Sequence, residues 1–385
     1  VQLNFLGGKV IDEMLDDQWQ QHILKHNAQV EKKSDVLKRF INIVCLLGQQ
    51  ELSFPAHDES TTSLNRNNYV GVAHFLSRYD DRLATHFSIA SSVFTGLSNH
   101  IQNDIVQSVS AVILDFIKKE LTVAPFVAIM MDETSDISLH SQLSIVFRYV
   151  DKDGKAQEWF VGFISTNRSM KALADMVFEC LKEFQCRNKL VAKTYDGAAI
   201  MSRELSGLQA HIIDHVVGQM NVQFSARDHL SFLSLMDGDA IPTYTRKIPQ
   251  ETFSCLIDGY GEHFDAVYLK NELITFYARD EYPRRNAAEI MLYLKKQHLD
   301  NAFSELYKLC GLVLTIPATT ASIERSFSTL KRIKTYSRST TVSGLAFLSI
   351  EKGIMQKLQE KGSEFCDAVI SEFTKKTHRV DFQFR

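Results

Sequence analysis

The chain has 385 residues, of which 45% are hydrophobic and 23% charged, an ordinary composition for a globular protein of two or three domains. The formal net charge of -3 excludes a general attraction to nucleic acid, so a DNA-binding surface requires a local basic patch. No apolar run is long enough to span a membrane, no signal peptide is recognisable and none of the six cysteines forms a C-x-x-C pair, so we expect an intracellular protein with reduced cysteines and no membrane partner.

The first 121 residues are predicted to form a helical region. Apolar residues at helical spacing over 36–47 indicate a helix that ends at Gly48, a plausible C-cap. Two more helices are predicted over 68–79 and 99–121, the second with an apolar stripe along one face.

After Pro125 the pattern changes to short apolar runs that favour strands. The predicted order is β-β-β-α-β, with strands over 126–131, 143–150, 159–164 and 190–195 and a helix over 173–184. The first three strands suit an antiparallel meander, and the helix is long enough to return the chain to a parallel neighbour.

Two of these strands run directly into a carboxylate. The first ends at Asp132, followed by Glu133, and the fourth ends at Asp196. If the fourth strand pairs with the first, Asp132 and Asp196 lie close together and repel each other unless a cation sits between them.

The remainder of the chain is predicted to be mainly helical. A short fifth strand is conceivable within 221–235, and helices are predicted over 283–297, 301–314, 345–358 and 364–375. A further helix after Pro317 carries Glu324 at the border of its apolar face.

Asp132, Asp196 and Glu324 together form a hard-oxygen ligand set suited to Mg²⁺ or Mn²⁺. Two such ions can activate a water and stabilise the leaving oxygen of a phosphodiester. The spacing alone leaves an alternative open, in which Asp132 and Glu133 are turn or capping residues and Glu324 is a solvated helix charge.

Three blocks of the sequence carry a resemblance to a known family. FVAIMMDETSD (126–136), TYDGAAIMS (194–202) and ATTASIERSFSTLKRIKT (318–335) resemble the signature blocks of hAT-superfamily DNA transposases. LSRYDDRLATHF (76–87) and ASSVFTGLSNHIQNDIV (90–106) are similar to the transposon-derived, zinc-finger-MYM-like branch.

The resemblance implies an α/β protein with an RNase H-like core, interrupted by a shortened helical insertion, that acts on DNA in the nucleus with Mg²⁺ or Mn²⁺. By motif position, Asp132, Asp196 and Glu324 are its metal-binding, catalytic acids. The implied domains are a helical N-terminal region (1–121), the first part of the core (122–235), a truncated insertion (236–300), and a closing part of the core that also forms the dimerisation region (301–385).

Several features depart from the family pattern. The family usually has a Cys where Phe224 stands, a longer interval between Asp196 and Glu324, and a Trp in the insertion that stacks on a flipped base. The two tryptophans here are Trp19 and Trp159, and no N-terminal zinc finger is recognisable. DNA contacts are then expected from the basic run Lys331, Arg332, Lys334 and Arg338, for which a solvated helix face is the alternative.

We therefore predict a transposase-derived protein that dimerises through its C-terminal region and binds DNA, with catalysis reduced or lost. An active metal-dependent transposase is the main alternative, and a helical structural protein with accidental acids is the weaker one. The predicted dimer surface consists of apolar residues beyond the needs of one packed face: Leu345, Leu348, Ile350, Ile354 and Leu358.

Overall fold

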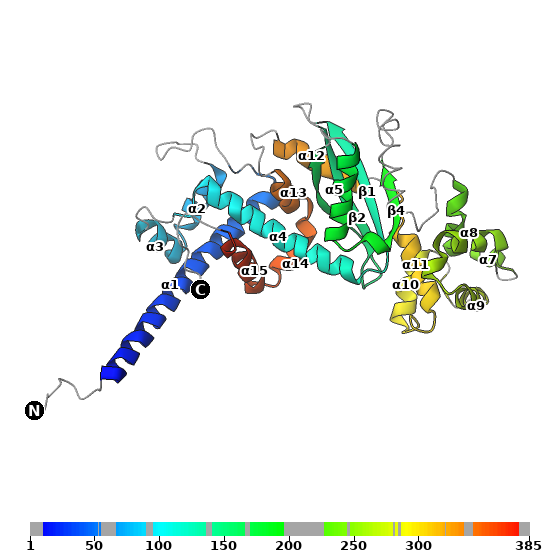
Figure 1. The fold of residues 1–385 in the computed structure, drawn as a ribbon, viewed down its shortest axis with the longest axis horizontal. Coiled ribbons are helices and arrows are strands. Elements are labelled where there is room, and N and C mark those ends of the chain that lie inside the picture. The colour runs from blue at the N-terminus through cyan, green and yellow to red at the C-terminus, as the bar shows by residue number, and fades with distance from the viewer. Residues whose placement is uncertain are drawn as a thin grey trace, which may run out of the picture. The chain divides into compact units, whose positions relative to one another are not determined.

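The computed structural model describes residues 11–52, 54, 67–89, 95–135, 141–165, 170–195, 227–244, 247–279, 282–283, 286–319, 321–334 and 342–376. Two compact units make up the chain (Figure 1). One combines residues 1–113 with 332–385, and the other comprises residues 114–331. Each unit is treated separately below.

The central unit, residues 114–331, contains a four-stranded mixed sheet. Its strands are β1 (Val127–Ser135), β2 (Ser141–Val150), β3 (Ala156–Ser165) and β4 (Leu190–Tyr195), in the spatial order β3-β2-β1-β4. β1 to β3 are antiparallel to one another, whereas β4 lies parallel to β1 and is reached through α5 (Met170–Glu183). The expected mixed α/β character of this part of the chain is therefore present.

The two faces of this sheet are covered by different helices. On one face, Tyr149 donates a hydrogen bond to Glu120 of α4 (Asn99–Val123) at 3.0 Å, and Phe147 packs edge-on against Phe184. On the other face, Arg148 of β2 donates to the carbonyl oxygen of Leu314 in α11 (Ser304–Thr315) at 3.0 Å. Neighbouring strand residues point to opposite faces, so the sequence alternation decides which side chains meet which helices.

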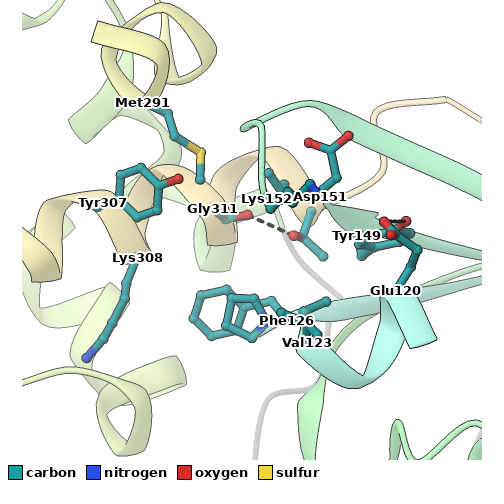
Figure 2. Close-up of a pocket in the computed structure, with 14 residues that line it drawn as sticks. Glu120, Val123, Phe126, Tyr149, Asp151, Lys152, Met291, Tyr307, Lys308 and Gly311 are labelled. Atoms are coloured by element: carbon teal, nitrogen blue, oxygen red, sulfur yellow. Dashed lines mark hydrogen bonds between the residues drawn. The ribbon is translucent and has the colours of Figure 1, made fainter. Parts of the chain in front are cut away.

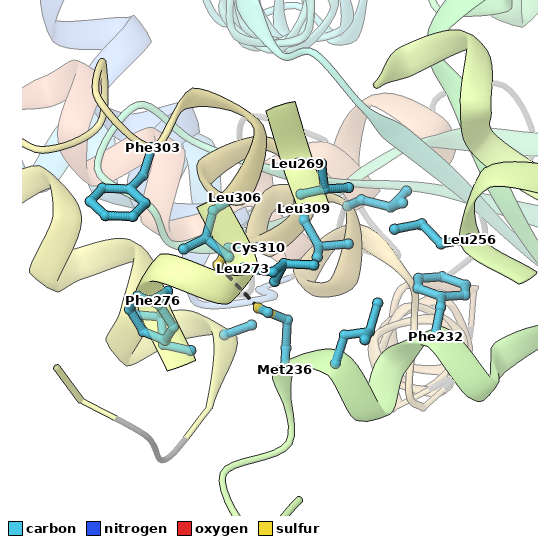
Figure 3. Packing of buried hydrophobic residues seen from close by; sticks show 14 of the residues in the cluster. Phe232, Met236, Leu256, Leu269, Leu273, Phe276, Phe303, Leu306, Leu309 and Cys310 are labelled. Atoms are coloured by element: carbon cyan, nitrogen blue, oxygen red, sulfur yellow. Dashed lines mark hydrogen bonds between the residues drawn. The ribbon is translucent and has the colours of Figure 1, made fainter. Parts of the chain in front are cut away.

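A helical module follows the sheet and packs on the second face. It contains η2 (Arg227–Met236), α7 (Ile241–Tyr244), α8 (Gln250–Tyr260), α9 (Ala266–Tyr277), α10 (Ala287–Lys296) and α11. Figure 3 shows side chains of η2, α8, α9 and α11 converging in one core, which also takes in Phe126, Val150 and Val191 from the sheet. The fifth strand suggested for 221–235 is wrong for its described part, which is the 3-10 helix η2.

The other unit is assembled from both ends of the chain. α1 (Ile11–Gln49) packs against α2 (Asn68–Leu76), α3 (Asp81–Ile89), α13 (Val342–Ile350) and α15 (Ser363–Thr374), and α14 (Lys352–Gln359) links the last two. α1 is far longer than the predicted helix over 36–47, because residues 19–35 contribute no side chain to the core that made that pattern visible.

Gly48 does not cap a helix end, because α1 continues through it to Gln49. A methyl group added at Gly48 would lie 2.6 Å from Cβ of Leu348 in α13, well inside van der Waals contact. The absence of a side chain therefore allows α1 and α13 to approach closely.

The predicted dimer surface is corrected by the burial of its residues. Leu345, Leu348, Ile354 and Leu358 are all buried, because α13 and α14 turn these side chains into the core of their own unit. The single helix predicted over 345–358 is in fact two helices, which breaks the continuous stripe on which the prediction depended.

The prediction for the cysteines is confirmed. All six are free, and Cys45, Cys186, Cys310 and Cys366 are buried. Within the part of the chain that the structure describes, no helix is both long and apolar enough to cross a membrane.

Candidate functional site

Asp132 lies near the carboxyl end of β1, after five fully buried apolar residues over 127–131. Its backbone partner across the β1–β2 ladder is Ser144. Directly opposite residues in an antiparallel pair point to the same face. Asp132 and Ser144 therefore share one face of the sheet, and the Asp132 side chain is half-buried there.

Helix α12 (Ala321–Lys334) is fixed on that same face by hydroxyl and ring contacts. The Ser326 and Ser144 hydroxyl oxygens are 2.8 Å apart, and both residues are fully buried. The ring of Phe327 stacks near that of Phe163, with centroids 6.3 Å apart. The helix that carries Glu324 thus packs on the strand residue opposite Asp132.

A polar chain holds the first turn of α12 to the edge of the sheet. Ser322 donates to Glu158 of β3, which also forms a half-buried ion pair with Arg148 of β2. Arg325 in turn donates to the Ser322 hydroxyl at 2.7 Å. This network and the Ser144–Ser326 pair together define the rotation of α12 about its axis.

Glu324 is exposed, next to the fully buried Ile323, which matches its expected place at the border of the apolar face. Asp196 lies outside the described residues, and the described parallel pairing ends at Met131 and Tyr195, immediately before Asp132 and Asp196 in sequence. Among the described residues no three His, Cys, Asp or Glu side chains gather into a metal-binding group, a search that leaves Asp196 out. The meeting of all three acids therefore stays a prediction.

Lys193 is a charged group, three residues before Asp196 in sequence, that sequence reasoning overlooked. It pairs in register with Ile129, which places it on the sheet face opposite to Asp132. Among the described residues its buried ammonium nitrogen has no hydrogen-bond partner, and burial lowers the pKa of Lys193 to about 8. The sequence signal that could have identified Lys193 is its position inside an otherwise apolar strand pattern.

Part of the predicted basic run is already held in an ion pair within the chain. Lys331 and Arg332 are exposed at the end of α12, but the Arg332 guanidinium is paired with Glu51, and Lys352 reaches the same carboxylate at 3.3 Å. The hydrogen bond from Arg332 is the main reason that the pKa of Glu51 is lowered. The side chain of Lys334 and all of Arg338 lie outside the described residues.

A cavity of about 200 Å³ opens at the other end of β1, next to Phe126 (Figure 2). Its walls are mainly apolar, and two of its polar groups are already hydrogen-bonded: the Tyr149 hydroxyl donates to Glu120, and that of Thr315 donates to the carbonyl oxygen of Gly311 at 2.8 Å. None of the predicted acids lines this cavity. It offers little to orient a polar ligand, so Asp132 and α12 remain the candidate site.

Comparison with protein families gives two matches: one covers the part of the chain that contains the sheet, and the other covers later helices that include α12. Residues 10–207, a little over half of the chain, match the ZMYM1/FAM200 RNase-like domain family. Residues 272–349 match the hAT family C-terminal dimerisation region, which thus begins within α9 and includes α10 to α12. The chain therefore belongs to the ZMYM1/FAM200 RNase-like domain family and carries a hAT-type dimerisation region.

Proposed function

We propose that this chain is a transposase-derived protein that has an RNase H-like fold, forms dimers through its hAT region and binds DNA, with catalysis reduced or lost. The observation that carries the proposal is the packing of α12 on the face of Asp132 through the Ser144–Ser326 pair. This packing supports a site to which two sequence blocks far apart in the chain both contribute.

The donor chemistry of the site fits a divalent cation. Asp132 stands near a strand end, and Glu324 belongs to the helix that packs on the same face, so both are hard-oxygen donors available to this region. Together with Asp196 they would hold Mg²⁺ or Mn²⁺, which when bound polarises a phosphodiester oxygen and lowers the pKa of a bound water. Within the chain, the hydroxyl pair and the Arg148–Glu158 ion pair orient the helix that supplies Glu324.

Self-association needs a surface other than the residues first predicted. Among the described residues within and beside the matched dimerisation region, the exposed large apolar side chains are Val267, Tyr268 and Ile274 of α9 and Leu292 of α10. Val267 and Ile274 are seven residues apart and so lie on one face of α9. An exposed apolar helix face of this kind is suited to a protein–protein contact, and we assign the dimer contact to it.

Reduced catalysis is favoured by the positions of the two tryptophans. Trp19 lies in α1, and Trp159 lies in β3, where its ring is buried and its indole N–H donates to the Tyr149 hydroxyl at 2.9 Å. Neither belongs to the helical module over 227–319, in which related transposases would place a base-stacking Trp. Stacking of a flipped base by Trp is thus missing from the described part of that module.

An active metal-dependent transposase is the second candidate, and one observation favours it. The strand carrying Asp132 and the helix carrying Glu324 keep a shared, well-packed face, which a protein without any use for the acids does not require. The two candidates agree on fold, dimer and DNA, and they differ only in the chemical step.

An assay on DNA with terminal inverted repeats separates the candidates. The full chain is incubated with labelled DNA and Mn²⁺, and both strand cleavage and DNA binding are followed, with Asp132→Asn as the matched variant. The proposal expects DNA binding that weakens with rising salt, because Lys331 and its basic neighbours contact phosphates, and cleavage no greater than that of Asp132→Asn.

Cleavage by the wild-type chain that disappears in Asp132→Asn would establish the active enzyme instead. Absence of salt-dependent DNA binding by a correctly folded chain would overturn the DNA-binding part of the proposal. Lys331→Glu is expected to weaken binding uniformly across DNA sequences, because phosphate contacts carry no sequence information.

A further inference from the structure

The N-terminal half of α1 is a helical arm in which none of the side chains over residues 19–30 is buried. Figure 1 shows it extending beyond the helices that pack on the other half of α1. Over residues 19–35 no side chain is buried, and the core begins at Val36. At 1.5 Å per residue this exposed stretch is about 25 Å long.

A single heptad seam runs through both halves of α1. In the packed half, Leu37, Phe40, Val44 and Leu47 alternate at spacings of three and four residues, and all four are buried. The same spacing continues towards the N-terminus through Lys33, Val30, His26, Ile23, Trp19 and Asp16, of which Val30, Ile23 and Trp19 are apolar. Apolar seams of this spacing are the pattern by which helices pair in coiled coils.

The arm exposes the apolar members of this seam to water. Trp19 is 66% exposed and Ile23 is 40% exposed, although large apolar side chains are normally buried against something. The described chain supplies no such cover. An exposed helix of this length gains most of its stability from packing along its apolar face, so a second helix is the natural cover for the seam.

The distribution of charge along the arm selects the partner and its direction. The first turns of α1 contain Asp12, Glu13, Asp16 and Asp17 and no base, whereas Lys25, Lys32 and Lys33 follow towards the body. Two parallel copies would bring Asp16 against Asp16 and Lys33 against Lys33. Two antiparallel copies would instead bring the acidic end of each against the basic stretch of the other.

The seam positions also match in the antiparallel direction. With the two-fold axis between residues 24 and 25, Asp16 faces Lys33, Trp19 faces Val30, and Ile23 faces His26 of the other copy. Each of these layers pairs the two alternating seam positions of the heptad, as antiparallel coiled coils require. Lys33 makes no ion pair with any residue within the described chain, so its charge is available for such a partner.

We propose that residues 16–33 of α1 pair with the same residues of a second copy of this chain in an antiparallel two-helix coiled coil. The surface is separate from the apolar face of α9 that we assign to the dimer. The chain therefore has two self-association surfaces, and the arm adds a contact that does not depend on the hAT region.

The test follows self-association of the full chain by sedimentation equilibrium over a concentration series. Trp19→Ser and Asp16→Lys are each expected to weaken association by roughly tenfold or more, by removing a seam layer or by placing like charges opposite each other. Adding Lys33→Asp to Asp16→Lys restores the opposite pairing in an antiparallel pair only, so the double variant is expected to regain the wild-type association.

Controls on the same helix and on α9 make the outcome decisive. Leu24→Ser removes an equally exposed apolar side chain (67%) that lies off the seam, and it is expected to leave association unchanged. Ile274→Asp removes the contact assigned to the hAT region, and the α1 variants are measured again in that background. Circular dichroism and the unfolding midpoint verify that each variant is folded.

Equal association of wild type and Trp19→Ser in both backgrounds would overturn the proposal. Failure of the double variant to recover would overturn the antiparallel arrangement. Loss of association by Ile274→Asp alone concerns the dimer surface of the proposed function and leaves the arm to be judged by its own variants.

Discussion

At the scale of single residues, the site depends on two hydroxyl groups as well as on its acids. Ser144 and Ser326 are fully buried and bonded to each other at 2.8 Å, between β2 and α12. Removing one partner leaves the other hydroxyl buried with a lost bond, which costs about 1–3 kcal/mol. Ser326→Ala should therefore lower the free energy of unfolding by that amount, as measured by urea denaturation.

The double variant Ser144→Ala/Ser326→Ala identifies the pair interaction. Its loss of stability should be smaller than the sum of the two single losses, because the second substitution leaves no unpaired hydroxyl. Ser328→Ala on the exposed side of α12 is the control, expected within about 0.5 kcal/mol of wild type. Additive losses would mean that the two hydroxyls act independently.

The sequence was informative about Asp132 and uninformative about these serines for a physical reason. A carboxylate at the end of an apolar strand is costly to bury, so it stands out in a one-dimensional pattern. A serine is compatible with almost any environment, and only the register of β1 with β2 and the contact with α12 give Ser144 its role. Glu324 was placed at the border of its helix by helical spacing alone, and its exposure agrees with that place.

At the scale of secondary-structure elements, α9 and α11 cap each other through glutamates from the neighbouring helix. Glu272 of α9 accepts a hydrogen bond from the backbone N–H of Leu306 at 2.7 Å, in the first turn of α11, where Phe303 provides no side-chain cap. Glu305 of α11 accepts from the backbone N–H of Asp265, just before α9, at 3.0 Å. Neither bond is visible in local capping patterns, because each donor and acceptor belong to different helices.

Two substitutions of Glu272 separate its hydrogen bond from its charge. Glu272→Ala leaves the Leu306 N–H unpaired and should cost about 0.5–2 kcal/mol, the usual range for a lost cap. Glu272→Gln keeps the acceptor and removes the charge. Burial, with a contribution from Glu305, raises the pKa of Glu272 above its usual 4.5, so the ionised form is disfavoured in the folded state.

The direction of the pH effect follows from this raised pKa. The wild type gains stability relative to Glu272→Gln below about pH 4.5 and loses that advantage as the pH rises through the folded-state pKa. Denaturation curves from pH 4 to 7 should therefore show Glu272→Gln improving relative to wild type with rising pH. A difference that does not vary with pH would contradict the raised pKa.

At the scale of the whole molecule, most secondary-structure elements were predictable from their strong periodicity. How these elements assemble was not predictable from the sequence. The strands of the sheet and the helices α4, α5, α11 and α15 lie close to their predicted ranges. The joining of α1 with α13 and α15 was not predictable, because it brings together opposite ends of the chain. The same fact explains the wrong dimer surface, since the apolar residues of α13 and α14 appeared to be in excess until α1 and α15 packed against these helices.

The contact between α1 and α13 gives a test of this assembly. Alanine is a better helix former than glycine by about 1 kcal/mol, so helix propensity alone predicts that Gly48→Ala stabilises the protein. Its methyl group, however, would lie 2.6 Å from Cβ of Leu348, an atom close to the backbone of α13 that cannot rotate away. Overpacking of this kind costs about 1–3 kcal/mol, so we expect Gly48→Ala to be destabilising.

Gly71→Ala is the matched control for this prediction. Gly71 also lies within a helix of the same unit, α2, but an added methyl group there meets no atom within 4 Å, so propensity should act alone and stabilise by up to about 1 kcal/mol. Opposite signs for the two variants in urea denaturation would show that α1 and α13 are held at the separation described here. If both variants were stabilising, the N-terminal and C-terminal helices would be packed more loosely than this contact requires.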